Sequence, residues 1–378
     1  MRMPIDWRAP SVEKASNMYQ PGSGSTLSFP RKLISVIGLS AAMVCVPAAQ
    51  VFAQDATEYE DTRSAVMSPL ASLALLIDVV KAGDRLVAVG SRGHIVYSDD
   101  QGASWQQADV PTRQMLTAVN FINANEGWAV GHDSLILHTT DGGESWTIQY
   151  RDPALQEEID EQGPGLLERP LMDVWFRDAN TGFAVGAYGL MLRTEDGGET
   201  WNEVDDVDNP NGFHYNAIAP IEGAGLFLVG EMGTVYRSPD YGDTWETLTD
   251  VPYDGSWFGV TGTGDTGVVL AWGLRGNMFR SEDFGDTWRQ IELTAPDGDP
   301  LESTLFGGGA SADGQEIVVV GVGGIVAVSE DRGRSFSVAV RPDRAALASA
   351  TVLENGQLLL VGQRGVVKAA ENGLPANR

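Results

Sequence analysis

Six aspartates recur along the sequence inside copies of one short motif, and carboxylates placed so regularly could serve either of two kinds of chemistry. They could act as general acids or bases on a substrate, or they could accept hydrogen bonds from the backbone of their own turn. The six aspartates are Asp100, Asp141, Asp196, Asp240, Asp283 and Asp331. In each copy Ser or Thr stands two residues before the aspartate, and Gly stands two residues after it. Because glycine at that position favours a tight turn with positive φ, the pattern predicts structural carboxylates rather than catalytic ones.

The intervals between these aspartates indicate the fold. They measure 41, 55, 44, 43 and 48 residues, and a degenerate seventh copy with Glu371 follows after another 40. Such periods are typical of four-stranded propeller blades, in which the motif is called an Asp box. A Val-Gly or Trp-Gly pair also recurs seven times, with its glycine at positions 90, 131, 186, 230, 273, 321 and 362. The sequence therefore predicts an all-β, seven-bladed β-propeller of four-stranded antiparallel blades.

The third repeat shows how the strands of one blade are expected to lie. Leu171–Phe176 is predicted as the inner strand, 183–186 as the second, 190–194 as the third and 201–204 as the start of the fourth. The aromatic residue that ends the box is expected to pack between neighbouring blades. Few residues follow Gly373, so we expect residues 57–67 to supply the fourth strand of the last blade and close the ring.

The N-terminus has the features of an export signal. Arg31 and Lys32 precede an apolar run from Leu33 to Val46, and small residues suitable for cleavage end at Ala53. The run is too short for a membrane span, which needs about 20 residues. We therefore predict an N-terminal extension and cleaved signal peptide over 1–53, a single propeller domain over 54–378, and a periplasmic location. Met1 and Met18 both stay open as start codons.

Charge and cysteine content narrow the possible partners. Cys45, the single cysteine, lies in the predicted signal, so thiol chemistry is not expected in the exported protein. Residues 54–378 contain 20 basic and 50 acidic side chains. Such a surface repels nucleic acid and anionic lipid headgroups, so neither is expected as a partner.

Three arginines interrupt this acidic background at equivalent turns of the predicted blades. They are Arg92, Arg275 and Arg364, each in a Gly-x-Arg-Gly or Gly-x-x-Gly context. Antiparallel strand order places these turns on the face opposite to the Asp boxes, together with the connections between blades. Since arginine recognises carboxylates through paired hydrogen bonds, we predict a partner-binding site there; solvated turn residues are the alternative. The long connection 151–170 is a further candidate for partner contact.

With these seven repeats, and with Gly127–Gly131 and Asp141–Trp146 among them, the chain resembles the photosystem II stability/assembly factor-like family of Asp-box propellers. The resemblance covers about residues 66–373 and implies a non-catalytic, exported protein that helps assemble or stabilise a membrane-protein complex. The family is known for a basic face, whereas this chain is strongly acidic. Nothing in the sequence points to a photosynthetic host, so the expected client is another complex of the cell envelope.

The Asp boxes are also compatible with a second function. A sialidase-like glycoside hydrolase or a carbohydrate-binding propeller is the alternative, because Asp boxes also occur in sialidases. The sequence has neither a Gly-x-Ser-x-Gly elbow nor a phosphate loop, and its four histidines have no metal-ligand spacing. We therefore expect a monomeric, non-enzymatic protein without metal or cofactor.

Overall fold

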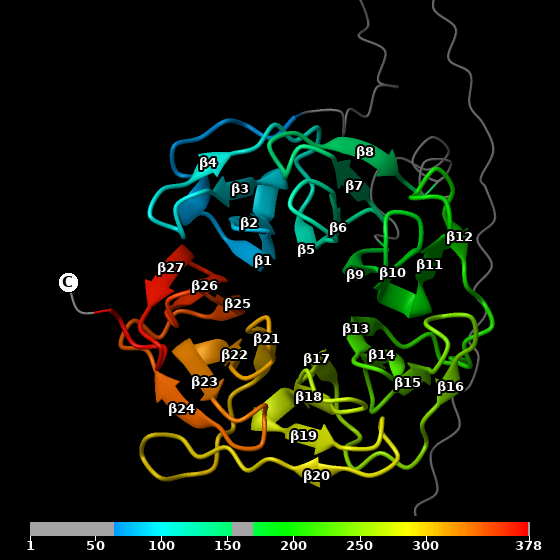
Figure 1. Cartoon of the computed structure of the whole chain (residues 1–378), viewed down its shortest axis with the longest axis vertical. Coiled ribbons are helices and arrows are strands. Elements are labelled where there is room, and N and C mark those ends of the chain that lie inside the picture. Colours follow the sequence, from blue (N-terminus) through cyan, green and yellow to red (C-terminus); the bar gives the residue numbers. More distant parts are fainter. Residues whose placement is uncertain (1–63, 153–168, 377–378) are drawn as a thin grey trace, which may run out of the picture. The chain divides into compact units, whose positions relative to one another are not determined.

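The computed structural model describes residues 64–152 and 169–376. These residues belong to one compact unit, Asp55–Arg378. They form seven antiparallel sheets that surround a central axis (Figure 1). In this part of the chain no helix is long and apolar enough to cross a membrane. The seven-bladed β-propeller predicted from the sequence is confirmed.

Each blade is built from one continuous stretch of chain, with its strands ordered from the axis to the rim. Blade one contains β1 (Leu76–Ala82), β2 (Arg85–Gly90), β3 (Ile95–Ser98) and β4 (Gln106–Gln107). Blade two contains β5 (Leu116–Phe121), β6 (Gly127–Gly131), β7 (Ile136–Thr139) and β8 (Thr147–Tyr150). Blade three contains β9 (Leu171–Phe176), β10 (Gly182–Gly186), β11 (Met191–Thr194) and β12 (Asn202–Glu203). The strands expected for the third repeat are thus confirmed to within a residue or two.

The remaining blades follow the same order. Blade four contains β13 (Tyr215–Ile221), β14 (Gly225–Gly230), β15 (Val235–Ser238) and β16 (Glu246–Thr247). Blade five contains β17 (Trp257–Gly262), β18 (Val269–Gly273), β19 (Met278–Ser281) and β20 (Arg289–Gln290). Blade six contains β21 (Leu305–Ala310), β22 (Ile317–Gly321), β23 (Ile325–Ser329) and β24 (Ser337–Val340). Blade seven contains β25 (Leu347–Val352), β26 (Leu358–Gly362) and β27 (Gly365–Ala369).

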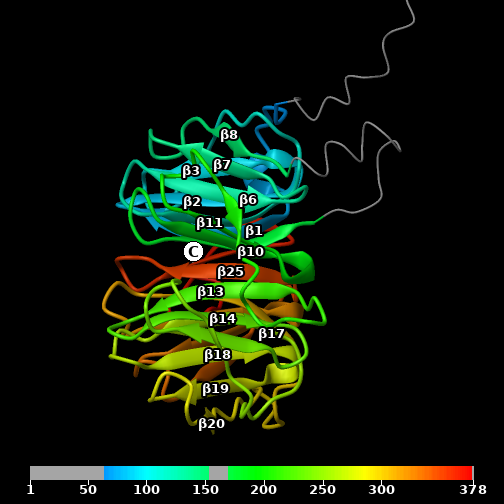
Figure 2. The same ribbon diagram turned by 90° about the vertical axis from the view of Figure 1, so that its right-hand side faces the viewer.

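The core lies between the blades rather than within them. Seven clusters of buried side chains each join residues of two neighbouring blades. The second strands are buried along almost their whole length because a neighbouring blade covers each of their two faces. Figure 2 shows these strands running across the thickness of the ring. Each turn between strands therefore lies on one of two opposite faces.

Close packing explains the glycine that ends every second strand. A side chain at Gly131 would place its Cβ 2.1 Å from the carbonyl oxygen of Met115, just before the inner strand. The equivalent glycines approach the same backbone position in their own blades, as Gly273 does with the carbonyl of Ser256. The Val-Gly and Trp-Gly pairs therefore mark where the second strand touches the start of the first.

Most of the predicted closing strand falls outside the described residues. Residues 57–63 lie outside the described part of the chain, and the described residues 64–67 form no strand. The backbone N–H of Ala65 donates instead to the carbonyl of Val110, in the connection between blades one and two. The ring closes by side-chain packing of blade one on blade seven, where Ser349 Oγ donates to Asp78 Oδ1 at 2.8 Å. Short polar side chains and apolar packing thus join blade one to blade seven at this junction.

Candidate functional site

The two faces of the ring carry different kinds of turn. The turns from first to second strand and from third to fourth strand lie on one face, here called the box face because it holds the Asp boxes. The turns from second to third strand and the connections between blades lie on the other, here called the turn face. The N–H of Gly93 donates to the carbonyl of Gln114 at 2.8 Å, so a turn and the following connection pack together on the turn face.

On the box face, each Asp-box carboxylate is fully engaged within its own turn. Asp240 accepts hydrogen bonds from the Thr244 N–H at 2.9 Å, the Thr244 hydroxyl at 2.7 Å and the Ser238 hydroxyl at 2.7 Å. Ser238 Oγ in turn accepts the N–H of Gly242, whose φ is +102°. Equivalent networks surround the other five aspartates.

These hydrogen bonds keep the Asp-box carboxylates ionised. Bonds from the Ser104 hydroxyl and N–H lower the pKa of Asp100 to about 2. Bonds from the Thr200 hydroxyl and N–H do the same to the pKa of Asp196. A carboxylate with so low a pKa is a poor proton carrier near neutral pH, so the arrangement suits a turn-stabilising role rather than acid–base catalysis.

Three arginines on the box face join neighbouring blades. Arg237 of blade four donates to Asp286 of blade five at 2.7 Å and to the Phe284 carbonyl at 3.1 Å. Arg193 reaches Asp243 and the Gly242 carbonyl in the same way. Arg85 contacts Glu144 and the Gly142 carbonyl of blade two. Each guanidinium therefore bridges to the Asp-box region of the next blade.

The turn face presents the three arginines predicted from the sequence. Arg92, Arg275 and Arg364 are all exposed, and within the described residues none of them is part of an ion pair. Arg92 and Arg275 have φ values of 60° and 56°. This left-handed backbone conformation is unfavourable for a side chain larger than glycine, and such outliers often accompany function.

The structure brings two of these arginines to the same segment and leaves the third elsewhere. Ser91, next to Arg92, donates its N–H to the carbonyl of Leu75 at 2.9 Å. Gly365, next to Arg364, packs tightly against the carbonyl of Ser72. Arg92 and Arg364 therefore flank residues 72–75 on neighbouring blades. Arg275 lies in blade five, separated from Arg364 by blade six.

Sequence reasoning missed two further exposed residues at the same turn position. Tyr188 and Met232 occupy the place that Arg92 and Arg275 hold in their blades, with φ values of 57° and 51°. Their side chains are 55% and 63% exposed. Alignment of the Gly-x-x-Gly turns with one another would have found both. Together with the arginines they give the turn face cationic and apolar groups, a combination common in protein-binding surfaces.

Two aspartates on the innermost strands of their blades also escaped the sequence analysis. Asp78 on β1 and Asp173 on β9 occupy the same register position, just after a β-bulge. Asp173 accepts the N–H of Ile218 in blade four at 2.9 Å, and Asp78 accepts the N–H of Val119 in blade two at 3.0 Å. Burial raises the pKa of Asp173 to about 7 and also raises the pKa of Asp78. Their oxygens hold adjacent inner strands together.

The structure does not support the other candidate sites, which are the long connection 151–170 and a metal site. Most of the long connection 151–170, with its acidic residues, lies outside the described residues. Over residues 64–152 and 169–376, no three His, Cys, Asp or Glu side chains gather in a group that could hold a metal ion. The turn face is therefore the best-defined candidate site.

Comparison with known sequences gives a family match. A family model described as "Photosynthesis system II assembly factor YCF48" matches residues 48–163 and 165–296. The chain is 32% identical over 117 residues to the Photosystem II assembly lipoprotein Ycf48 of Synechococcus sp. (strain CC9902). That alignment covers 30% of the chain and 31% of the relative. The chain is also 34% identical over 101 residues to the chloroplastic Photosystem II stability/assembly factor HCF136 of Cyanidioschyzon merolae (strain NIES-3377 / 10D), covering 26% and 22%. The chain thus spans less than a third of the length of these two curated relatives.

Comparison with solved structures shows the fold. A structure of YCF48 bound to D1 peptide aligns with a TM-score of 0.61 and 17% identity, covering 83% of this chain and 96% of that one. Virginiamycin B lyase from Staphylococcus aureus aligns with a TM-score of 0.62 and 10% identity, covering 81% and 97%. An assembly factor and a lyase thus share this architecture, so the fold does not decide between binding and catalysis.

Proposed function

Because the chain belongs to the Photosynthesis system II assembly factor YCF48 family, we propose that it is a non-catalytic accessory protein for a membrane-protein complex. In this proposal it binds a protein subunit while the complex is assembled or maintained. One family structure is of YCF48 bound to D1 peptide, which supports a polypeptide as the ligand. The proposal also includes export to the periplasm and a client in the cell envelope, both motivated by the signal-like N-terminus.

The observation that carries this proposal is the charge distribution of the turn face. The chain has a formal net charge of −27, yet Arg92, Arg275 and Arg364 on its turn face are exposed and have no carboxylate partner among the described residues. On the box face, by contrast, arginines are bound to nearby acidic side chains. Unpaired guanidinium groups on the same face as the exposed Tyr188 and Met232 suit a polypeptide that carries carboxylates and apolar side chains.

Affinity capture tests the proposal. Tagged protein would be incubated with detergent-solubilised envelopes, and bound proteins would be identified by mass spectrometry. We expect the unmodified chain to capture subunits of one membrane complex and the triple variant R92E/R275E/R364E to lose at least 90% of them, about a tenfold weakening. A matched pair sharpens the test, because Arg275 and Arg289 are both exposed arginines of blade five. We expect Arg275→Glu to weaken capture and Arg289→Glu, at the rim strand β20, to leave it unchanged.

Two outcomes would contradict different parts of the proposal. If the unmodified protein captures no envelope protein, the accessory role fails. If the triple variant captures the same complex as well as the unmodified chain does, the role stands but the turn face is not the binding site.

A further inference from the structure

Exposed apolar side chains are concentrated in the short segment that precedes β1. Within the described residues nine large apolar side chains are exposed, and five of them fall in residues 66–75. These five are Val66, Met67, Leu70, Leu73 and Leu75. Residues 64–75, here called the apolar segment, contain no charged side chain. Such a group of exposed apolar side chains usually marks an interaction site.

Hydrogen bonds to blade one hold the apolar segment in place. The N–H of Ser68 donates to Gln107 Oε1 at 2.8 Å, and Gln107 Nε2 donates to the carbonyl of Val66 at 3.1 Å. At the other end, the carbonyl of Leu75 accepts the N–H of Ser91 at 2.9 Å. A partner therefore meets a preformed surface, which lowers the entropic cost of binding.

The 3-10 helix η1 (Ala71–Leu73) sets the direction of the leucines. Ala71 is 2% exposed and packs in the cluster that joins blades seven and one. Leu70 and Leu73 stand three residues apart, and side chains at this spacing lie on the same side of a 3-10 turn. They are 61% and 60% exposed. Both leucines therefore lie on the side of the turn that faces away from the core.

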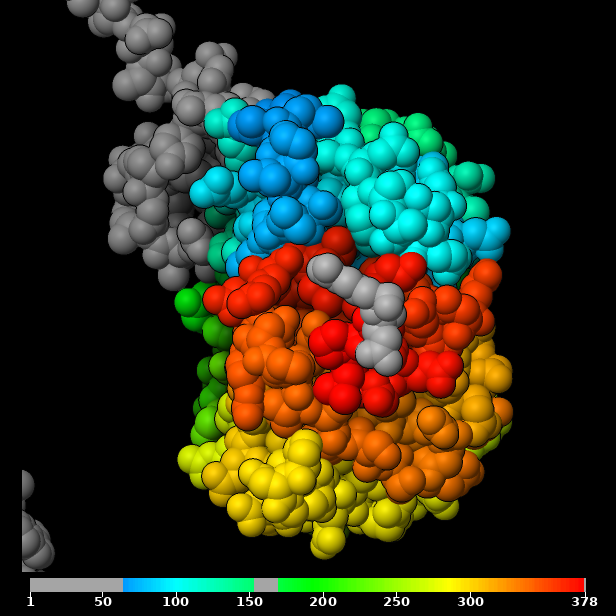
Figure 3. Space-filling model, turned by 90° about the vertical axis from the view of Figure 1, so that its left-hand side faces the viewer, coloured from blue at the N-terminus to red at the C-terminus, as the bar shows by residue number. Residues whose placement is uncertain are grey.

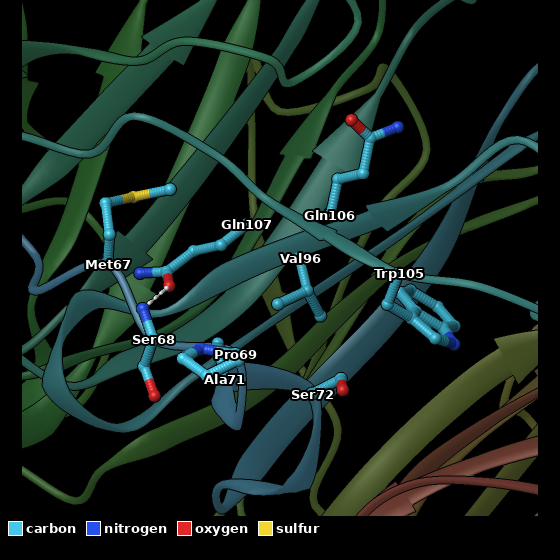
Figure 4. A pocket seen from close by; sticks show the side chains of 9 residues that line it. All are labelled: Met67, Ser68, Pro69, Ala71, Ser72, Val96, Trp105, Gln106 and Gln107. Atoms are coloured by element: carbon cyan, nitrogen blue, oxygen red, sulfur yellow. Dashed lines mark hydrogen bonds between the residues drawn. The ribbon is translucent and has the colours of Figure 1, made fainter.

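A cavity adjoins the apolar segment on blade one. It measures about 320 Å³ and is bounded by residues 67–72 and by Val96, Trp105, Gln106 and Gln107 (Figure 4). Val96 and Trp105 give it an apolar wall, and the exposed amide of Gln106 offers hydrogen bonds at its rim. A cavity of this size accommodates one large side chain rather than a whole ligand.

Trp105 belongs to the Asp box of blade one, and its surroundings differ from those of its counterparts. In blades two to five the tryptophan of the box contacts an aromatic ring, with centroids 5.7–6.1 Å apart. Among the described residues Trp105 has no such contact and packs with aliphatic side chains such as Leu359. An aromatic side chain of a partner, seated in the cavity, would supply the aromatic contact that this tryptophan lacks.

Basic side chains border the apolar segment. Arg92 and Arg364 flank residues 72–75, and at the other end Arg113 Nε donates to the Ser64 carbonyl at 3.0 Å. Helix η1 contacts β3, β4 and β27, and none of these strands contains an acidic residue although the chain has 52. Figure 3 shows the first described residues, in blue, on the surface beside blade seven, in red. A ligand on the apolar segment therefore meets cations at both ends, and carboxylates would complement them.

We propose that the apolar segment and its cavity anchor a short acidic segment of a partner protein. One aromatic side chain of the partner enters the cavity and contacts Trp105, and a second apolar side chain packs on Leu70 and Leu73. Carboxylates of the partner face Arg92 and Arg364. Burial of apolar surface supplies affinity, and the charges fix the orientation. This inference rests on the proposed function in that the ligand is a polypeptide, and it adds where the apolar anchor lies.

The charges favour an acidic polypeptide over a lipid surface or a second copy of this chain. A net charge of −27 repels anionic lipid headgroups, and it also repels another copy of the same chain. A short acidic segment can place its few carboxylates at the arginines alone. Its backbone can also bond to the exposed Gln106 amide, which a lipid tail cannot do.

A synthetic peptide tests the proposal on the full chain. The probe is the fluorescein-labelled peptide Gly-Asp-Glu-Phe-Leu-Glu-Asp-Gly, and its matched control has serine in place of phenylalanine and leucine. By fluorescence anisotropy, we expect the control peptide to bind at least about tenfold more weakly than the probe. We expect the double variant L70S/L73S to weaken binding of the probe by a similar factor, because both leucines would lose the surface that the peptide covers.

Two further variants separate the contributions to binding. Ile148→Ser changes an exposed apolar residue on β8, outside the apolar segment, and should alter affinity for the probe by less than about twofold. The variant R92Q/R364Q should weaken binding at least about fivefold at low salt, and salt should then affect affinity less than in the unmodified chain. All four substituted residues are exposed, so we expect each variant to fold as the unmodified chain does, and urea unfolding checks this.

Crosslinking locates the bound peptide without any variant. With p-benzoylphenylalanine in place of the phenylalanine of the probe, we expect crosslinks to residues 67–72 or 105–107, which line the cavity. Crosslinks confined to other parts of the chain would overturn the proposal. Equal affinities of L70S/L73S and the unmodified chain for the probe would also overturn it.

Failure of the probe to bind the full chain would overturn the proposal as well, and two assays then identify another occupant. Sedimentation with vesicles of phosphatidylethanolamine and phosphatidylglycerol, lost in L70S/L73S, would assign the apolar segment to a lipid surface. A dimer in analytical ultracentrifugation that L70S/L73S dissociates would assign it to a second copy of the chain.

The two proposals can fail separately. If the chain captures an envelope client but the probe does not bind, the accessory role stands and the anchor site fails. If the probe binds and crosslinks as expected but no envelope protein is captured, the anchor site stands and the accessory role fails.

Discussion

Two sets of three arginines lie on opposite faces of this propeller, and their surroundings differ. Arg85, Arg193 and Arg237 on the box face each contact an acidic side chain and a backbone carbonyl of the next blade. Arg92, Arg275 and Arg364 on the turn face are exposed and have no ion pair within the described residues. The same side chain is thus a bridge between blades on one face and is available to a partner on the other.

The comparison shows that the neighbouring turn determines whether an arginine bridges two blades or stays available to a partner. The Asp boxes supply an acidic residue directly after their glycine, at Glu144, Asp243 and Asp286, and these residues bind the box-face arginines. The Gly-x-x-Gly turns supply no such group to Arg92 or Arg275. The predictions that follow test whether the box face is structural, from the largest expected effect to the smallest.

Removal of an Asp-box carboxylate should produce the largest loss of stability. Asp240→Ala leaves the N–H of Thr244 and two hydroxyl groups without their acceptor. We expect the free energy of unfolding in urea to fall by about 2–3 kcal/mol, while envelope capture is retained under conditions where the variant is folded. Asp205→Ala, at an exposed residue of blade three, is the control and should change stability by less than about 0.5 kcal/mol. A similar loss in both variants would contradict the structural role of the box.

The inner-strand carboxylates Asp78 and Asp173 should give a pH dependence of stability opposite to that of the Asp boxes. The pKa of Asp173 is about 7 in the native state against 3.8 for the free group, so the native state holds the extra proton between these values. Stability from this residue is therefore present below pH 4 and is lost as the pH rises through 7. The stability that the ionised Asp-box carboxylates contribute has the opposite pH dependence, because their pKa is lowered in the native state. It is lost as the pH falls below about 4.

Asp173→Asn isolates this effect because asparagine does not titrate. We expect the stability of the unmodified chain relative to this variant to fall by up to about 1.4 kcal/mol per pH unit between pH 5 and 7 in urea unfolding. The relative stability should level off above pH 8. Parallel pH profiles for the two proteins would show that Asp173 is ionised throughout, against the burial argument.

Loss of one arginine bridge should have the smallest effect. Arg237→Gln removes partly exposed ion pairs to Glu246 and Asp286, and such pairs contribute about 1 kcal/mol or less. We expect a loss of that size at low salt and a smaller one at 0.5 M NaCl, because salt screens the attraction. Arg275→Gln on the turn face should leave stability unchanged at both salt concentrations. Equal losses in the two variants would remove the distinction between the faces.

Local repetition made most of the fold predictable from the sequence. Each Asp box and each Val-Gly or Trp-Gly pair is dictated by backbone geometry within one blade, so the blade count and the strand positions followed directly. Asp78 and Asp173 were not predictable in the same way, because they act on the backbone of a neighbouring blade. A single aspartate on an apolar strand gives no sequence signal for such a contact.

The closing strand and the arginine site show two other limits of prediction from the sequence. Prediction of 57–67 as a fourth strand relied on the usual closure of propellers; of this segment the structure describes only residues 64–67, where Ala65 donates its N–H to the Val110 carbonyl. The three turn arginines could be placed on one face from strand order alone. Their spacing around the ring, and the exposed Tyr188 and Met232 at equivalent turns, required the structure.

Site-specific photocrosslinking is the most direct test of the claim that the turn face binds an envelope client. A photoreactive amino acid would replace Arg275 on the turn face and, in a separate variant, Asp286 at the exposed box-face turn of the same blade. In envelopes, we expect the residue at 275 to crosslink one membrane-complex subunit and the residue at 286 to crosslink it at least tenfold less. Crosslinking of that subunit from position 286 but not from position 275 would contradict the account and assign binding to the opposite face.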